Sequence, residues 1–162
     1  MKAPPHGQPD ARGLKVAVLH AGFNAEVVRG LVEGAHAALV EMGAGEKDIE
    51  VVQVPGAFEL PLAARAAAHY GHFDAVVALA AVIRGETDHY EHVAREASTG
   101  LAAVARDTLV PVGFGVLTVD REEQARARAV PGPGNKGAEA ARAAVAMVHV
   151  IRGLRGVRPA LE

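Results

Sequence analysis

The sequence predicts a single-domain α/β protein built around a parallel sheet, and two features lead to this prediction. Four short apolar segments alternate with segments in which apolar residues recur at helical spacing. This alternation is typical of parallel strands joined by helical crossovers, with helices on both faces of the sheet. The third apolar segment, residues 75–83, holds no polar side chain, which fits a strand buried on both faces. At 162 residues, the chain has the length of one domain.

The predicted elements follow this alternation along the chain. The strands are expected at residues 14–21, 49–54, 75–83 and 111–118, and the helices at about residues 25–42, 60–70, 88–107, 122–129 and 136–152. Asn24 is placed to cap the first helix, and Gly30 and Gly34 inside that helix indicate close packing against another backbone. The predicted fold is a three-layer sandwich around a four-stranded parallel sheet, doubly wound and flavodoxin-like.

The two ends of the chain predict less regular structure. Residues 1–12 contain three prolines and no apolar core, which favours a flexible Pro-rich N-terminal extension and argues against a signal peptide. We therefore expect a folded domain over residues 13–155, a loose C-terminus over residues 156–162, and a cytoplasmic location.

Composition excludes several classes of site and partner. The chain has no cysteine, so disulfides, thiolate metal ligands and cysteine nucleophiles are excluded. It has no HExxH motif and no ligand-spaced cluster of histidines and carboxylates, so we predict no metal. A net charge of −2 gives no case for a nucleic-acid or membrane partner. Hydrophobic residues make up 50% of the chain, but most are Ala and Val, which favours burial of further surface against copies of itself.

The carboxyl ends of parallel strands are where doubly wound sheets bind ligands, and here they are followed by residues 22–24, 55–59, 84–89 and 118–120. In the third of these segments Gly85, Glu86 and Thr87 lead from a buried strand to a helix N-terminus, where free backbone N–H groups can bind a phosphate. His89 follows at the start of the helix, and histidine is suited to moving protons near neutral pH. The alternative is an ordinary strand-to-helix turn with an exposed histidine.

Aromatic and acidic residues flank the same edge of the predicted sheet. Phe23 and Phe58 each follow a strand, so each either stacks on a planar ligand or fills the core. Glu59 either accepts hydrogen bonds from hydroxyl groups or is an acidic residue favoured at a helix N-terminus.

Three basic residues near the last predicted loop are further candidates. Arg126, Arg128 and Lys136 form either an anion-binding cluster or a solvated charged surface. Neither GxxxxGK[ST] nor GxGxxG occurs in the chain, so the usual fingerprints of nucleotide sites are absent.

Six motifs occur in order along the chain: VPGAFELP at residues 54–61, VIRGETDHY at 82–90, EASTGL at 96–101, PVGFGVLT at 111–118, EQA at 123–125 with Arg128, and GNKG at 134–137. Together they closely resemble the 6,7-dimethyl-8-ribityllumazine synthase family. The resemblance runs from about residue 14 to residue 150, and the combination of motifs is highly specific.

The resemblance implies a transferase of the penultimate step of riboflavin biosynthesis. Such an enzyme condenses 5-amino-6-(D-ribitylamino)uracil with 3,4-dihydroxy-2-butanone 4-phosphate to give 6,7-dimethyl-8-ribityllumazine, releasing phosphate and water and needing no cofactor. A flavin-binding or shell-forming relative without catalytic activity is the alternative.

The resemblance also implies residue roles. His89 would transfer protons. The phosphate would be bound by Gly85, Glu86, Thr87, Arg128 and Lys136. The pyrimidine and ribityl groups would be bound by Phe23, Asn24, Gly56, Ala57, Phe58, Glu59, Val82, Ile83 and Phe114. One departure is Gly22, where the family commonly has an arginine, and this glycine favours a looser end of the first strand.

The partners implied are small-molecule substrates, further copies of the chain and riboflavin synthase. In the family, Phe114, Arg128 and Lys136 reach the site of a neighbouring copy, so the active unit would be at least a pentamer. Members that stop at pentamers or decamers tend to carry extra residues between the last two helices. Residues 129–135 instead have the compact spacing of members that form an icosahedral capsid of sixty subunits.

Overall fold

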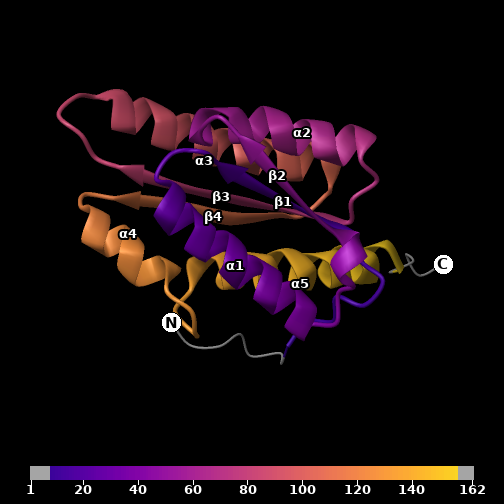
Figure 1. Ribbon diagram of the computed structural model, residues 1–162. Coiled ribbons are helices and arrows are strands. Elements are labelled where there is room, and N and C mark those ends of the chain that lie inside the picture. Colours follow the sequence, from indigo (N-terminus) through magenta and orange to yellow (C-terminus); the bar gives the residue numbers. More distant parts are fainter. Residues whose placement is uncertain (1–7, 157–162) are drawn as a thin grey trace.

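The structure is a computed structural model that describes residues 8–156. A central sheet contains four strands, β1 (Val16–Ala21), β2 (Ile49–Val54), β3 (Ala75–Ile83) and β4 (Val112–Val119). Neighbouring strands are all parallel and lie in the order β2-β1-β3-β4 (Figure 1). This is the flavodoxin-like order of a doubly wound sheet, so the predicted fold class is confirmed.

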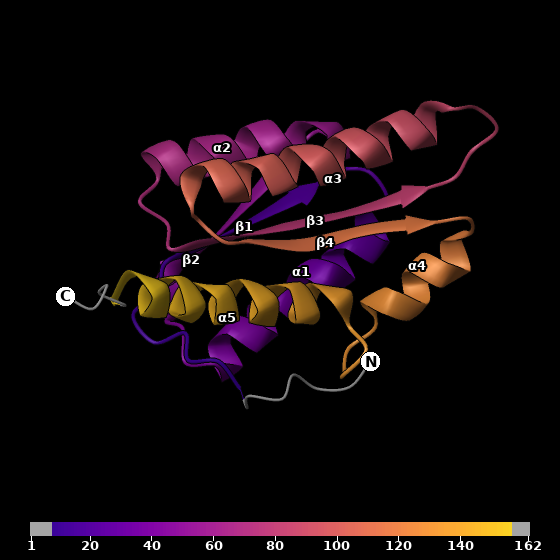
Figure 2. The ribbon, with the colours of Figure 1, turned by 180° about the vertical axis from the view of Figure 1, so that it is seen from behind.

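Helices cover both faces of the sheet (Figure 2). On one face lie α1 (Ala25–Glu41), α4 (Glu122–Ala129) and α5 (Lys136–Gly156), and on the other lie α2 (Leu60–Tyr70) and α3 (His89–Thr108). Two short 3₁₀ helices, η1 (Glu46–Asp48) and η2 (Ala57–Glu59), precede β2 and α2. No helix within residues 8–156 is long and apolar enough to cross a membrane.

The central strand β3 explains why the core has two halves. Side chains of a strand alternate between its faces, and those of β3 are buried on both. Val77 and Leu79 pack with α1 and α5, whereas Val76 and Ala78 pack with α2 and α3. The continuous apolar run that predicted a doubly buried strand is thus accounted for.

Glycines allow α1 to lie directly against the connection between α4 and α5. A Cβ atom on Gly30 would collide with the carbonyl oxygen of Ala129, and one on Gly34 would collide with the side chain of Asn135. In the same way, Gly137 on α5 lies against the backbone of Leu31 on α1. The close approach expected from the two glycines in α1 is confirmed.

Asn24 does occupy the cap position of α1, but its side chain caps nothing. Its backbone is left-handed (φ 54°), and its Nδ2 donates a hydrogen bond of 2.8 Å to the carbonyl of Ala81 at the end of β3. The expected side-chain cap is therefore wrong, because this amide instead links the β1–α1 turn to the neighbouring strand.

The ends of the folded unit differ from the expected boundaries. Within the predicted extension, Ala11 is buried, and its N–H donates to the carbonyl of Met42 at 2.8 Å, so this part packs on the end of α1. Hydrogen bonds from Arg12 lower the pKa of Asp10 to about 2. Helix α5 continues to Gly156, past the expected end at residue 152. Residues 1–7 of the predicted extension and residues 157–162 of the predicted loose C-terminus lie outside the described residues.

Candidate active site

Three predicted site residues come together at the carboxyl ends of β1 and β2. A Cβ atom on Gly56 would lie 3.3 Å from two ring carbons of Phe23 and 3.2 Å from Oε2 of Glu59. The ring and the carboxylate therefore both lie over this glycine, which leaves them room to approach. Phe23 is 70% exposed and Phe58 is 58% exposed, so neither phenylalanine fills the core of the subunit.

The end of β1 beneath Phe23 is held tightly. The N–H of Gly22 donates to the carbonyl of Val54 at 2.9 Å and approaches that of Pro55 at 3.3 Å. A Cβ atom on Gly22 would lie only 2.9 Å from Nε2 of Gln53. The looser strand end expected from Gly22 is therefore wrong, because close packing against β2 restrains the backbone.

The carboxyl end of β3 lies beside these residues. The hydrogen bond from Asn24 to Ala81 brings the β1–α1 turn against β3, and Val82 and Ile83 follow, both half-buried. The buried residue Ala57 opens η2 across from them. Val82 packs on the side of α2 and α3 and Ile83 on the side of α1 and α5, so their side chains flank the end of β3 on opposite faces of the sheet.

The loop from Gly85 to Asp88 extends beyond β3 and is exposed throughout. A Cβ atom on Gly85 would meet nothing within 4 Å, so the backbone faces open space. His89 is the first residue of α3, and its N–H lies 3.4 Å from Oγ1 of Thr87. An open glycine and a hydroxyl in front of a helix N-terminus have the elements of an anion site.

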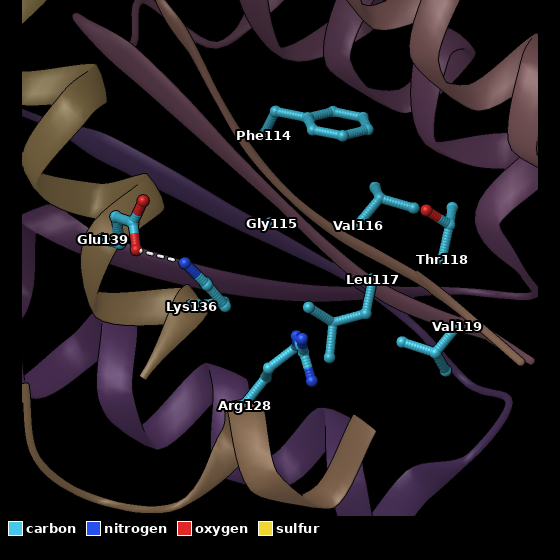
Figure 3. A pocket seen from close by; sticks show the side chains of 9 residues that line it. All are labelled: Phe114, Gly115, Val116, Leu117, Thr118, Val119, Arg128, Lys136 and Glu139. Carbon is cyan, nitrogen blue, oxygen red and sulfur yellow. Dashed lines mark hydrogen bonds and ion pairs between the residues drawn. The ribbon is translucent and has the colours of Figure 1, made fainter. Parts of the chain in front are cut away.

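A second group of predicted residues lines a pocket of about 320 Å³ along the outer edge of β4 (Figure 3). Its walls come from β4, α4 and α5, through Phe114, Gly115, Val116, Leu117, Thr118, Val119, Arg128, Lys136 and Glu139. Nζ of Lys136 donates to Oε2 of Glu139 at 2.8 Å. Arg128 donates to the backbone carbonyl of Gln124 at 2.9 Å, and no carboxylate of residues 8–156 forms an ion pair with it.

Arg126 does not join this basic pair. Its guanidinium lies 2.6 Å from Glu122 and 2.9 Å from Glu26, and these two carboxylates raise its pKa. Of the three basic residues considered as an anion-binding cluster, only Arg128 and Lys136 therefore share a pocket.

Phe114, in the second group, lies apart from the loop after β3 within the chain. Phe114 pairs with Ala78 in the sheet, whereas Ile83 at the carboxyl end of β3 pairs with Val119. The six residues from Ala78 to Ile83 are five steps apart and span about 16 Å along the strand. The ring of Phe114 and the Gly85–His89 loop consequently do not share a pocket in the isolated chain.

Two residues near these groups were not predicted as part of a site. Glu139 pairs with Lys136 three positions earlier, a spacing that brings side chains together on a helix and so gave a signal in the sequence. Arg84 contacts Tyr90, Glu91 and Asp120. The last of these contacts joins residues far apart in the sequence, so local spacing gave no signal for it.

These features define a flavodoxin-like α/β protein whose candidate binding residues gather where the sheet reverses its winding, between β1 and β3. Residues 13–152 match the family model described as 6,7-dimethyl-8-ribityllumazine synthase. The chain therefore belongs to the 6,7-dimethyl-8-ribityllumazine synthase family, which consists of transferases of riboflavin biosynthesis.

Two relatives show how much of the chain the likeness covers. Both are named 6,7-dimethyl-8-ribityllumazine synthase and come from Nitratidesulfovibrio vulgaris, strains DP4 and Hildenborough. Each is 48% identical over 134 residues, which cover 83% of this chain and 86% of the relative.

Proposed function

We propose that this chain condenses 5-amino-6-(D-ribitylamino)uracil with 3,4-dihydroxy-2-butanone 4-phosphate, at a site that two neighbouring copies build together. Family membership supports the reaction. The single structural observation that supports the shared site is the separation of Phe114 from the loop after β3 along the sheet. One group follows the carboxyl ends of β1, β2 and β3, and the other lines the outer edge of β4.

The first group suits the pyrimidine substrate. The exposed ring of Phe23 offers a stacking surface for the heterocycle, and Val82 and Ile83 end the adjoining strand β3. The carboxylate of Glu59 can accept hydrogen bonds from ribityl hydroxyls, and the segment Gly56–Phe58 supplies the remaining wall. Asn24 fixes the β1–α1 turn, which carries Phe23, to β3 through Ala81.

The loop after β3 suits the phosphorylated substrate. Gly85, Glu86 and Thr87 precede a helix N-terminus, where backbone N–H groups and the helix dipole favour a phosphate. His89 lies immediately beyond it, within reach of a substrate whose phosphate is held in this loop. In the reaction, the free amine attacks the ketone, and one water leaves as a Schiff base forms. Phosphate is then eliminated, and the ribitylamino nitrogen closes the ring on the remaining carbonyl with loss of a second water.

His89 accepts and returns protons during these steps. Bringing the two substrates together supplies a large part of the acceleration, because it converts a bimolecular encounter into a reaction within one complex. Proton transfer by an imidazole adds to this contribution.

A second copy completes the site with Phe114, Arg128 and Lys136. Phe114 is 50% exposed, and Arg128 has no carboxylate partner in the described chain, so both are available to a neighbour. A contact between two different surfaces of identical subunits repeats head to tail, and it closes into a ring when the rotation between neighbours is a whole fraction of a turn. We propose a pentameric ring, and sixty subunits in an icosahedral capsid as the larger assembly.

The proposal extends to the setting of the enzyme. Its partners are the two small molecules, further copies of the chain, and riboflavin synthase, which consumes the lumazine product; neither nucleic acid nor membrane is a partner. We propose a cytoplasmic location, because a phosphorylated substrate does not pass freely through a lipid bilayer.

Mixing the purified protein with both substrates tests the activity directly. We expect an increase in lumazine absorbance that depends on both substrates and exceeds the uncatalysed rate. A protein that binds riboflavin or assembles but leaves this rate unchanged would instead be the non-catalytic relative considered above.

Subunit mixing tests the shared site. The His89→Ala and Arg128→Ala chains should each be impaired, and co-assembly of equal amounts should restore about a quarter of the wild-type sites. A site is intact only where a chain that keeps His89 meets a neighbour that keeps Arg128, and each of these conditions holds in about half of the cases. Each variant assembled alone, carried through the same mixing step, is the control. No recovery beyond the average of the two variants would place both residues in one subunit's site and overturn the shared arrangement.

A further inference from the structure

The loop that carries the proposed phosphate site has few contacts of its own. Residues 84–89 are all exposed, and Gly85 faces open space. The N–H of His89 reaches the Thr87 hydroxyl only at 3.4 Å, and Asp88 gives α3 no side-chain cap. Segments with so little packing open easily. A site that must present its N–H groups in a fixed direction needs restraint from elsewhere.

Arg84 supplies contacts on both sides of this loop. Its backbone N–H donates to the carbonyl of Val119 at 2.9 Å, which continues the pairing of β3 with β4. Its guanidinium lies 4.4 Å from the centre of the Tyr90 ring, and its Nη1 lies 3.5 Å from Oε1 of Glu91. One side chain therefore spans from the residue before the loop to the first turn of α3 after it.

The same guanidinium also holds the start of the next crossover. Nε of Arg84 donates to Oδ1 of Asp120 at 2.9 Å. The N–H groups of Asp120 and Arg121 in turn donate to Oε1 of Gln124 in α4, at 2.9 and 3.0 Å. The hydrogen bond to Asp120 raises the pKa of Arg84, so the guanidinium keeps its charge over the working range of the enzyme. The loop is thereby fixed against the β4–α4 turn as well as against α3.

We propose that Arg84 is a positioning residue, which fixes the Gly85–His89 loop so that its N–H groups and the His89 ring face the phosphorylated substrate. This inference rests on the proposed function of that loop. Arginine suits the role because its planar guanidinium can lie on an aromatic ring while its edges reach two carboxylates. Lysine keeps the charge but loses this combination of contacts.

The test compares Arg84→Met, Arg84→Lys and Tyr90→Leu with the wild-type enzyme. Arg84→Met should raise the KM for the phosphorylated substrate and the dissociation constant for inorganic phosphate by about threefold to tenfold, since it removes a cation–π contact and exposed ion pairs together. The KM for the pyrimidine should change less than about twofold. Arg84→Lys should recover only part of the loss, and Tyr90→Leu should show the same substrate preference with a smaller effect.

Arg142→Met is the matched control. Arg142 forms a comparable ion pair of 3.6 Å with Glu41, between α5 and α1, on the face of the sheet opposite to α3. This variant should leave both KM values and phosphate binding unchanged. The thermal midpoint of each variant, measured at one protein concentration, accompanies the kinetics.

The possible outcomes separate this inference from the proposed function. Equal rises in both KM values, or wild-type behaviour of Arg84→Met, would overturn the positioning role. If the wild-type protein forms no lumazine, the proposed function fails, and titration calorimetry with inorganic phosphate still decides the role of Arg84. In that case, weaker phosphate binding by Arg84→Met than by Arg142→Met supports the positioning role. Equal phosphate binding by the wild type, Arg84→Met and Arg142→Met, or no binding by any of them, refutes that role.

Discussion

His89 begins α3, and no side chain of residues 8–156 hydrogen-bonds its ring, so the imidazole is open to substrate. General acid–base catalysis contributes about 10²- to 10⁴-fold in typical enzymes. Holding the two substrates together already supplies much of the rate acceleration. We therefore expect His89→Ala to lower kcat by about a hundredfold or less. Both KM values should stay close to wild type.

The control for this variant lies one turn further along the same helix. His92 is exposed on α3, and His92→Ala should leave steady-state kinetics unchanged. Wild-type turnover by His89→Ala would exclude that residue from proton transfer.

Arg128 allows a second prediction on single residues. Its guanidinium has only the Gln124 carbonyl as a hydrogen-bond acceptor in the described chain, so its charge is available to a phosphate. A charge-assisted hydrogen bond contributes about 1.5–3 kcal/mol. We therefore expect Arg128→Ala to raise the KM for the phosphorylated substrate by about tenfold to a hundredfold, with a much smaller effect on the pyrimidine.

Arg126 is the matched control, because it lies on the same helix but pairs with Glu26 and Glu122. Initial rates with Arg126→Ala should resemble those of the wild type for both substrates. A similar rise in both KM values for Arg128→Ala would indicate a general disturbance of the fold and contradict a specific phosphate contact.

At the scale of single residues, the sequence was a good guide to the candidate site residues. It was a poorer guide to the contacts that those residues make. Exposure of Phe23 and Phe58 removes core filling as their role, a choice that the sequence left open. The cap expected from Asn24 was wrong, because its amide bonds to Ala81, which lies 57 positions away. Contacts over such separations depend on the order of strands, which local patterns do not specify.

The elements themselves were largely predictable, because most begin and end at changes in periodicity or at Gly and Pro. The observed bounds of β2, β3, α2 and α4 coincide with the predicted ones. Helix α5 exceeds its expected end at residue 152, and β1 begins at Val16 rather than residue 14. The distance between Phe114 and the loop after β3 could not be predicted from the order of the elements alone, because it depends on the register of β3 with β4.

The connection between α4 and α5 depends on one buried polar residue. Asn135 is 1% exposed, and its Nδ2 lies 3.0–3.1 Å from the carbonyls of Gly30, Ala129 and Val130. Its Oδ1 accepts a hydrogen bond from the N–H of Ala138 at 3.0 Å. This side chain therefore joins α1 to both ends of the loop that separates Arg128 from Lys136.

We expect Asn135→Ala to lower the free energy of unfolding by about 2–4 kcal/mol, because it leaves buried carbonyls and an N–H without partners. Urea unfolding at a fixed protein concentration measures this loss. Asn135→Asp keeps Oδ1 but removes the Nδ2 donor, and it should also destabilise the fold. Wild-type stability of both variants would show that water replaces these hydrogen bonds at no cost.

On the scale of the whole molecule, the described chain leaves unusual apolar surface uncovered. Three of the four phenylalanines, Phe23, Phe58 and Phe114, are at least half exposed, while the core consists mainly of small residues. On the outer strand β2, Val51 and Val52 are also exposed. Exposed apolar surface of this kind favours binding of a ligand, as proposed for Phe23 and Phe58, or contact with another copy of the chain. Stability and assembly are then linked, because association stabilises the folded chain.

The last prediction concerns the size of the assembly. Seven residues, Ala129–Asn135, separate Arg128 from Lys136, which is the compact spacing that the family resemblance associates with closed shells. Asn135 fixes this connection to α1, so the direction of α5 is set by buried hydrogen bonds rather than by a long loop. The stiffness of Pro131 and Pro133 argues in the other direction, because it can bend this connection along a different path and so favour the free pentamer. From the compact spacing we expect a sixty-subunit icosahedral shell, with the free pentamer as the alternative.

Analytical ultracentrifugation near neutral pH in phosphate buffer distinguishes the two assemblies. With chains of 16.7 kDa, a shell sediments as a species of about one megadalton, whereas a pentamer is roughly twelvefold lighter. Insertion of a short Gly/Ser segment after Pro133 should loosen the orientation of α5 and shift the population towards pentamers. The inserted variant should retain part of its lumazine formation, because adjacent subunits of one ring still meet although Lys136 loses its fixed position. A single wild-type species of about five subunits would contradict the shell while leaving the proposed reaction intact.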